Sequence, residues 1–494
     1  MSTLSPVSDS APSNALGRAL DRAVFLGLLT LLLALPLPFG SHRPWAEYAF
    51  GAAVFSLLVM QSMAFAVSRV KLTRLDIGVG SMISLWVLWL AWVWAQTLPW
   101  PQSWLAWGSP QRWQHLQFAA GVLRTETLTM APPSLDATLG RAQALLSSVY
   151  ATLFLLLILS LRHRSRFEWL LWTLLISGIA QAAYGSLMVL SQLEYGAWGA
   201  KDAYRGFATG TFVNRNHFAG YMEICIGVAL GLIVATPDRT RTLQTWRQRL
   251  LRLLTFLQEG RMFARASIAL FFVALILSQS RMGNVSAVAG LCAASAALLL
   301  VRRSGNVVGG MLLVASILLV DIWLFGRWFG LDELAQRFAT VDASMDGRLL
   351  IFRDVQKMIP EYFRVGSGLG TFALAYPQFR SPEILGFVDH AHNDYAQFLV
   401  ETGVIGCALL GTMVIVTMGR AILILRRRRD PVARGISAAA IAAITALGVH
   451  STADFNLQIP AVAATLVVLI AAVWACPTRS SRDHRYVRDT QVRE

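Results

Sequence analysis

Long apolar runs separated by short polar segments set the strongest limit on how this sequence folds. A helix needs about 20 mostly apolar residues to cross the hydrocarbon core of a bilayer. We therefore predict an all-α, polytopic membrane protein with about twelve transmembrane helices. The runs lie near residues 23–40, 46–68, 76–98, 142–161, 168–190, 218–236, 264–280, 284–301, 306–325, 395–418, 433–450 and 460–476.

The composition supports this fold class. Of the 494 residues, 55% are hydrophobic and 14% are charged, whereas soluble domains carry about a quarter charged residues. The four cysteines lie within apolar runs or at the edge of one, which argues against a disulfide framework or a cysteine-rich metal site. A polar leader precedes the first run and no small-residue cleavage site follows it, so we expect this run to be retained.

The lysines and arginines predict the orientation of the chain. Basic loops stay in the cytoplasm, and most of the 43 basic residues fall on one side when the N-terminus is placed there. The net charge of +15 then records topology, and we expect no nucleic-acid partner. We also expect the basic stretch 243–257 to lie on the anionic inner leaflet. The predicted parts are a cytoplasmic leader (1–22), the first nine transmembrane helices (23–325), a large, partly helical periplasmic loop (326–394), the last three helices (395–476) and a cytoplasmic tail (477–494).

The sequence predicts local structure in two of the outward-facing segments. Segment 99–141 carries four tryptophans, which we interpret as an interfacial belt because indole rings prefer the headgroup zone. In the large loop, the sequence predicts helices over 331–338 and 348–358, the second closed by Pro360. The four tryptophans are Trp100, Trp104, Trp107 and Trp113.

Polar segments at the outer ends of the apolar runs need a reason, because charges there are costly. In the first of them, Arg215 stands between Asn214 and Asn216 and is followed by His217, at the start of the sixth run. A guanidinium, amide donors and a helix N-terminus all present positive potential, so this segment suits an anion. The structural alternative is an arginine that caps the bundle or meets a lipid phosphate.

The second polar segment contains Arg281, between two apolar runs with almost no loop. Its side chain has little room to reach away from the bundle. Two arginines that converge on one face suit a pyrophosphate, which takes two or more cationic partners. An interfacial arginine at a tight turn is the alternative.

The third polar segment is the densest and contains His390 and His392 with Asp389 and Asp394. These residue types suggest a metal site, but their spacing is too short for a helical pair of ligands. A neutral histidine near a carboxylate is also a general base that can take a proton from a sugar hydroxyl. Solvated loop histidines are the remaining alternative, and we predict no metal.

Three further features lie on the same outer side: Arg348, the glycine-rich turn 366–370 and the segment 450–460. We do not expect the turn to bind a nucleotide, because no strand precedes it. The segment 450–460 joins the last two runs. It either lines the same cavity or forms a satisfied polar turn.

These residues resemble the O-antigen ligase and polymerase superfamily of bacterial inner membranes. The most specific match is a histidine and an asparagine separated by nine residues from Gly-x-x-Gly, present here as His392, Asn393, Gly403 and Gly406. The arginine motifs and the glycine-rich turn occur in the order that such proteins show. Motifs of this kind cover roughly residues 205–410.

The resemblance implies a GT-C-like membrane glycosyltransferase in the inner membrane, with a periplasmic active site and no cofactor. The donor would be a glycan on undecaprenyl pyrophosphate, and the acceptor a lipid A core or a growing glycan. Carried over, Arg215 and Arg281 bind the pyrophosphate as it leaves, and His392 is the base of a metal-independent, inverting transfer. We expect substrate contacts from Asn214, Asn216, His217, Arg348, His390, Asn393 and Tyr395.

Several functions remain open from the sequence. Ligation of O-antigen and polymerisation of repeat units share the donor chemistry, and the set of two arginines and a histidine favours ligation narrowly. Protein O-glycosylation is a third choice of acceptor. A transporter of amphipathic anions would suit twelve spans, but transporters carry their polar residues near the bilayer midplane and often in two related halves. A membrane scaffold is the last alternative.

Overall fold

The chain is almost entirely helical in a computed structural model that describes residues 12–68, 77–126, 129–196, 199–201, 203–236, 260–301 and 343–477. Among these residues, 9 helices are long and apolar enough to cross a membrane. The prediction of an all-α, polytopic membrane protein is confirmed. The predicted run 306–325, the predicted helix 331–338 and the basic stretch 243–257 lie outside the described residues.

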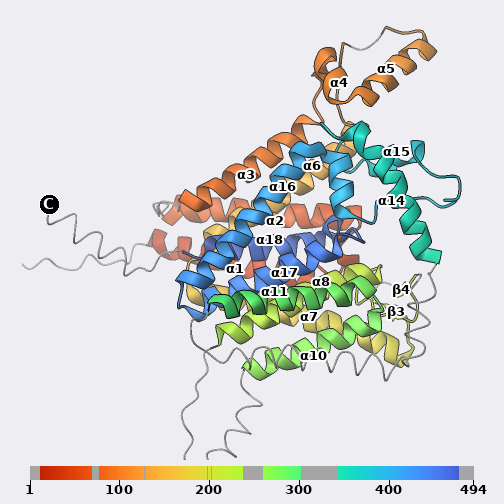
Figure 1. Cartoon of the computed structure of the whole chain (residues 1–494). Helices are drawn as coiled ribbons and strands as arrows, with labels where there is room; N and C mark the ends of the chain where they lie inside the picture. Colours follow the sequence, from red (N-terminus) through yellow and green to blue (C-terminus); the bar gives the residue numbers. More distant parts are fainter. Residues whose placement is uncertain are drawn as a thin grey trace, which may run out of the picture.

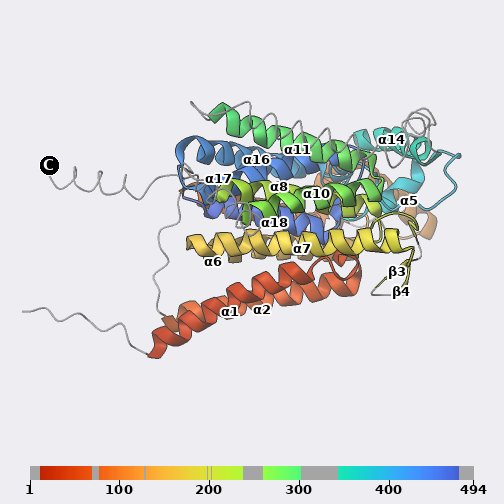
Figure 2. The ribbon, with the colours of Figure 1, turned by 90° about the horizontal axis from the view of Figure 1, so that it is seen from below.

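The long helices run side by side in one bundle (Figures 1 and 2). A further helix, α18, is apolar but shorter, and α1 precedes the others at the edge of the bundle beside α2. Their bounds are α1 Pro12–Ala34, α2 Pro44–Ser68, α3 Ile77–Ala95, α6 Ala137–Ser160, α7 Arg164–Ser191, α8 Arg215–Ala235, α10 Gly260–Ser278, α11 Arg281–Val301, α16 Asp394–Arg427, α17 Pro431–His450 and α18 Pro460–Ala475.

Shorter elements connect these helices. Two antiparallel two-residue pairs, β1 with β2 and β3 with β4, are the strands of the described chain. The short elements are β1 Trp100–Pro101, α4 Gln102–Gly108, α5 Pro110–Leu123, β2 Met130–Ala131, β3 Tyr195–Gly196, β4 Gly199–Ala200, α14 Ala343–Tyr362, α15 Phe372–Ala375 and the 3₁₀ turns η1 Phe39–Ser41, η2 Tyr376–Gln378 and η3 Asn456–Gln458.

Helix α8 forms the centre of the bundle and packs most extensively on α17. Small residues let the two backbones approach: a Cβ at Gly231 would lie 2.6 Å from the carbonyl oxygen of Gly435, and one at Gly227 would lie 2.9 Å from that of Ala439. Lipid chains are as apolar as the side chains they replace, so membrane helices associate through close packing of this kind. The packing fixes the residues at the ends of α8 and α17 relative to each other.

The two ends of the bundle differ in charge and in structure. At one end, basic residues of the first turn of α7 pair with acidic residues: Arg164 contacts Asp430 at 3.2 Å and Arg166 contacts Asp21. At the other end gather α14, α15, β3 and β4, at the right of Figure 1. The polar segments that the sequence analysis singled out also meet at this second end, where the Thr211 hydroxyl donates to the carbonyl of Pro36 at 2.6 Å.

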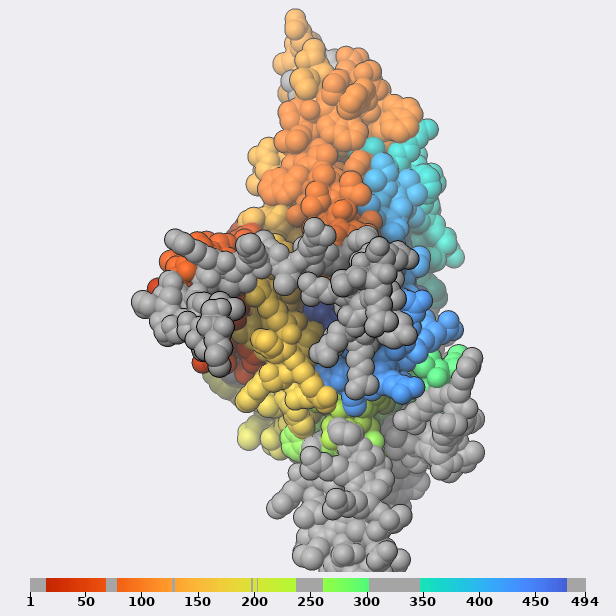
Figure 3. Space-filling view, turned by 90° about the vertical axis from the view of Figure 1, so that its left-hand side faces the viewer, coloured from red at the N-terminus to blue at the C-terminus, as the bar shows by residue number. Residues whose placement is uncertain are grey.

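The segment of α4 and α5 projects beyond the bundle (Figures 1 and 3). Trp104 and Trp107 are about two-thirds exposed, at 65% and 63%, as an interfacial belt requires. Trp113 differs, because it is buried against Leu105 and Ala131 in a small separate core. The predicted belt is therefore reduced by one tryptophan, which the fold uses for packing.

Helix α14 extends beyond the predicted helix 348–358 at both ends, and Pro360 lies inside it rather than at its end. The helix continues to Tyr362, within the last turn, where the ring costs one hydrogen bond at a point where the helix is about to end. From α14 the chain enters the glycine-rich turn 366–370, which packs on the kink of α16 at Gly403.

Close backbone contacts explain the glycines at two places, the kink of α16 and the turn 366–370. Gly403 has φ +65° and interrupts α16, and a Cβ there would lie 2.5 Å from the carbonyl oxygen of Arg364. Gly366 has φ +89°, and its Cβ would lie 2.2 Å from the carbonyl oxygen of Glu401. The Ser367 amide donates to the carbonyl of Val400 at 2.8 Å. The glycines thus join the outer loop to the start of α16, and their role here is structural.

We predict that Gly403→Ala lowers the free energy of unfolding by about 2 kcal/mol or more, because alanine is strained at positive φ and has no room. Gly419→Ala is the matched control on α16, since a Cβ there meets nothing within 4 Å. Alanine should stabilise that helical position by about 0.5–1 kcal/mol. Unfolding followed by tryptophan fluorescence measures both changes, and equal effects would contradict the packing role of Gly403.

Candidate functional site

A cavity of about 370 Å³ lies at the second end of the bundle and collects the polar residues of five separate segments. These are the start of α8, the turn between α10 and α11, the first turns of α14, the segment before α16, and the loop between α17 and α18. Its polar lining consists of Arg215, Asn216, Gln279, Ser280, Arg281, Arg348, His392, Asn393, His450, Thr452 and Asp454.

The carboxylate of Asp454 is the centre of this arrangement and is 1% exposed. It accepts hydrogen bonds from the Asn216 side chain and from the Phe455 amide, the latter at 3.0 Å. Arg348 reaches it with Nη2 at 3.4 Å and also donates Nη1 to the carbonyl of Ala453 at 3.2 Å. Three stretches of chain far apart in sequence are thus joined at one buried charge.

The charge state of Asp454 follows from these neighbours. Burial alone would raise the pKa of its carboxyl group. The contacts with His392, His217 and Arg348 outweigh burial and hold the pKa of Asp454 well below its usual range. Asp454 is therefore a carboxylate at any physiological pH.

His392 faces this carboxylate with one ring nitrogen: Nδ1 lies 3.4 Å from Oδ1 of Asp454. The side chain is 23% exposed, so the ring is reachable from the cavity. The backbone of His392 is left-handed, with φ +49°, which costs free energy for a residue that is not glycine. Strain of this kind persists where the surroundings require one orientation of a side chain.

Asn393 holds the next residue of that segment in place. Its side-chain oxygen accepts from the Ala396 amide at 3.0 Å and so caps the start of α16. Its side-chain nitrogen donates to the carbonyl of Thr452 at 3.0 Å. Asn393 therefore ties the start of α16 to the loop that carries Asp454.

The two arginines predicted to bind an anion stand at helix N-termini. Arg215 is the first residue of α8 and Arg281 the first residue of α11, and both line the cavity. Helix N-termini add positive potential to that of the guanidinium groups. The Arg215 guanidinium lies over the ring of Phe207, 4.3 Å from its centroid, which restricts its direction.

Four of the predicted substrate contacts lie beside the cavity rather than on its lining. Asn214 caps α8 by accepting from the Asn216 amide at 2.9 Å. His390 stacks on Phe455 with ring centroids 4.0 Å apart, and His217 meets the same ring edge-on at 4.6 Å. Tyr395 donates its hydroxyl to the carbonyl of Gly448 at 2.7 Å.

Burial decides the charge of the histidines in the surrounding loops. It lowers the pKa of His390, whose Nδ1 lies within hydrogen-bonding distance of the Gln397 side chain. It also lowers the pKa of His42, to about 4. These two rings are neutral packing groups at neutral pH. Among the described residues, no group of three or more His, Cys, Asp or Glu side chains is arranged to hold a metal ion.

Asp454 is the main site residue that the sequence analysis did not select. The sequence makes the segment 450–460 a candidate lining, but nothing in the segment distinguishes this carboxylate. One signal was available: a carboxylate in a short polar stretch between two apolar runs is costly without a partner. Its partners are on other helices and could not be read from the sequence.

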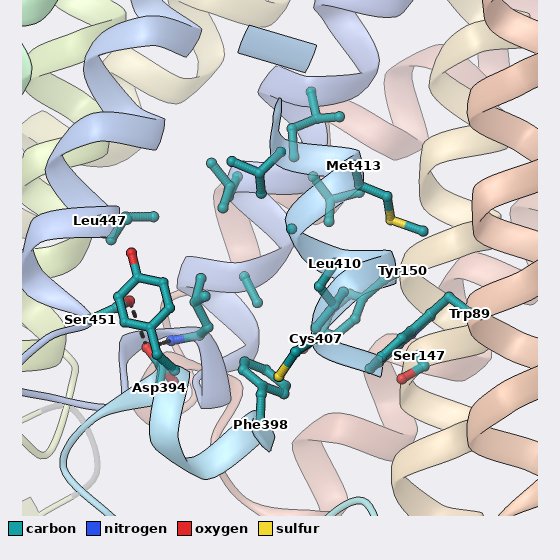
Figure 4. Close-up of a pocket in the computed structure, with 18 of the residues that line it drawn as sticks. Trp89, Ser147, Tyr150, Asp394, Phe398, Cys407, Leu410, Met413, Leu447 and Ser451 are labelled. Carbon is teal, nitrogen blue, oxygen red and sulfur yellow. Dashed lines mark hydrogen bonds between the residues drawn. The ribbon is translucent and has the colours of Figure 1, made fainter. Parts of the chain in front are cut away.

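A second pocket, of about 580 Å³, lies between α3, α6, α16, α17 and α18 and is mainly apolar (Figure 4). Trp89, Phe398 and Met413 are part of its lining. At one end is Asp394, which accepts from the Ser451 hydroxyl at 2.8 Å. Asp394 comes two residues after His392, so the apolar pocket and the charged cavity adjoin the same stretch of chain.

We predict that Asp454→Asn lowers the free energy of unfolding by about 3 kcal/mol, because it removes a buried charge from its ion pair with Arg348 and its contact with His392. Since the pKa of Asp454 is low in the folded state, this contribution is complete above about pH 4 and is lost only as pH falls through that lower pKa. The difference between variant and wild type should therefore be constant between pH 5 and 8.

Asp389→Asn is the matched control, because Asp389 is an exposed carboxylate three residues before His392. It should change the free energy of unfolding by less than about 0.5 kcal/mol. Urea unfolding at several pH values compares the two. A difference for Asp454→Asn that disappears at pH 5 would contradict the low pKa.

The model of the family described as O-Antigen ligase matches residues 266–411. No curated protein matches the chain. The matched range contains Arg281, Arg348 and His392, whereas Arg215 and Asp454 lie outside it and reach the same cavity through the fold. Residues 266–411 are thus similar to O-antigen ligases, and the predicted resemblance to this superfamily is confirmed.

Proposed function

We propose that this protein is a membrane glycosyltransferase that moves a glycan from undecaprenyl pyrophosphate to an acceptor hydroxyl at the periplasmic face. The observation that carries the proposal is the cavity itself, which is lined by two arginines at helix N-termini and by a histidine whose Nδ1 lies 3.4 Å from a buried carboxylate. Pyrophosphate requires the cations, and an acceptor hydroxyl requires the base.

In the proposed reaction, His392 takes the proton of the acceptor hydroxyl. Because Nδ1 points to Asp454, Nε2 is the nitrogen that accepts the proton. The acceptor oxygen attacks the anomeric carbon on the side opposite the pyrophosphate, so the configuration inverts. The bond from that carbon to the phosphate oxygen breaks, and the electron pair leaves with the pyrophosphate.

The leaving pyrophosphate carries the charge that develops in this step. Arg215, Arg281 and Arg348 line the cavity. Phe207 orients Arg215 and Asp454 orients Arg348 before substrate arrives, which lowers the cost of stabilising that charge. In this proposal the arginines do the work that a divalent metal does in other transferases. The imidazolium formed on His392 is stabilised by Asp454.

The acceptor is inferred from the family description rather than from the geometry of the site. The family description favours O-antigen ligation to lipid A core. Polymerisation of O-antigen or exopolysaccharide uses the same donor chemistry and remains the main alternative, followed by transfer to protein. The apolar pocket beside the charged cavity supports a lipid-linked substrate of either kind. We also propose that the protein lies in the inner membrane and that both of its termini are in the cytoplasm.

We expect His392→Ala to reduce transfer at least about 100-fold, because general-base catalysis typically contributes that much or more. His163→Ala is the control, since His163 is exposed at the opposite end of the bundle. Transfer from a synthetic undecaprenyl-pyrophosphate glycan is measured with purified protein. Full activity of His392→Ala would remove it from the mechanism.

Lipopolysaccharide gels of a deletion strain complemented with the same variants identify the acceptor. Loss of long-chain bands with an intact core indicates ligation, and a single-repeat band indicates polymerisation. An unchanged pattern directs the search to exopolysaccharide or protein acceptors.

We expect Arg215→Lys to lower kcat/KM roughly tenfold or more, because an ammonium does not replace a bidentate guanidinium. Arg205→Lys is the matched control: Arg205 is exposed on the same loop and outside the cavity lining. Normal kinetics of Arg215→Lys would mean that Arg215 caps the bundle and does not bind the pyrophosphate.

A chelator tests metal independence in the wild-type protein. Activity that survives the chelator would support it, and loss of activity that a divalent ion restores would contradict it.

A further inference from the structure

A fully buried pair of titratable side chains adjoins the charged cavity and has no part in the mechanism above. Nδ1 of His450 lies 2.6 Å from Oε1 of Glu223, and both side chains are 0% exposed. Glu223 is seven residues after Asn216 on α8, which is two helical turns, so both residues face α17 and its following loop. The pair Glu223–His450 thus repeats, deeper in the bundle, the pairing of Asn216 with Asp454.

The second ring nitrogen of His450 is not engaged by Glu223, which contacts Nδ1. His450 belongs to the cavity lining, and its Nε2 is buried without a hydrogen-bond partner among the described residues. Unpartnered buried polar atoms are uncommon in folded proteins and call for an explanation. A ligand in the cavity would supply the missing partner.

Charge balance indicates that this nitrogen carries a proton. A carboxylate inside a helix bundle is costly unless a cation compensates it, and His450 is in direct contact with Glu223. His450 is also in the last turn of α17, where the helix dipole favours positive charge. With Nδ1–H directed to Glu223, an imidazolium presents Nε2–H to the cavity.

We propose that His450, oriented and charged by Glu223, is a further anion-binding residue of the cavity and donates Nε2–H to a phosphate of the donor. This inference rests on the proposed function, because it takes the ligand to be a pyrophosphate. The hydrogen bond strengthens as the bond between the sugar and the phosphate oxygen breaks, since charge then builds on the leaving group. No proton is transferred in this role.

Other charged groups near His450 must be considered in a pH experiment. These titratable or charged groups belong to four parts of the chain: Glu223 and His217 on α8, Asp394 on α16, Asp454 on the loop after α17, and Arg281 on α11 across the cavity. A comparison between variants at each pH isolates the contribution of the pair, because the other groups are present in every protein tested.

The test uses inorganic pyrophosphate as the probe and the full chain in nanodiscs, with binding measured by isothermal titration calorimetry. We expect Glu223→Gln to weaken pyrophosphate binding about tenfold at pH 7, the loss of one charged hydrogen bond. Binding to wild type should fall as pH rises and His450 loses its proton. In Glu223→Gln this fall should begin at lower pH, because the carboxylate that favours the imidazolium is gone.

Two further variants complete the test. His450→Gln keeps a side chain of similar length without a charge and without a need for Glu223 to be ionised, so it serves if Glu223→Gln fails to fold. It should also bind about tenfold more weakly. Tyr221→Phe is the matched control on α8: it removes the buried hydrogen bond between the Tyr221 and Ser177 hydroxyls, 2.8 Å long, outside the cavity lining. Its pyrophosphate affinity should be that of wild type.

Arg215→Ala separates this inference from the proposed function. If Arg215→Ala loses binding while both pair variants bind as wild type, the pair is structural and the inference is wrong, but the proposed function stands. If Arg215→Ala also binds as wild type, the cavity is not a pyrophosphate site and both fail. Weaker binding in the pair variants with an unchanged pH profile would assign the loss to packing and overturn the role of the charge.

Discussion

One buried carboxylate, Asp454, holds together the parts of the chain that form the candidate site. It joins α8, α14, the segment before α16 and its own loop, and its partner Asn216 is 238 residues away in sequence. A buried charge without such partners would cost several kcal/mol, so these contacts are required by the fold. Because the fold already requires them, Arg348 and His392 are oriented before any substrate arrives.

The distances within this network depend on how closely α8 and α17 approach. Glycines at the contact bring backbone against backbone, which leaves little freedom for one helix to slide on the other. Two polar pairs, Asn216 with Asp454 and Glu223 with His450, are therefore held at successive levels along the same interface. The glycines are distant from the cavity but set its geometry.

The sequence predicts the fold class well and the site in part. Apolar length alone identifies the helices, because a bilayer imposes that length on each span. Arg215, Arg281 and His392 stood out because charges at the ends of apolar runs are costly, and all three line one cavity. The same reasoning did not separate them from His217 and His390, which pack on Phe455, since packing and binding histidines look alike in sequence. Asp454 and Glu223 were missed because their partners are on other helices.

The depth to which polar residues extend into the helix bundle distinguishes an enzyme that acts at the membrane surface from a transporter. Along the contact of α8 and α17, polar pairs extend from Asn216 to Glu223. Beyond Glu223, Gly227 and Gly231 bring the two backbones together and leave no polar path between these helices. A transporter needs polar groups near the midplane that are reached from both sides. The cavity lining reaches His450 but includes none of Glu223, Gly227 and Gly231, which suits a reaction on a polar headgroup whose lipid chain stays in the membrane.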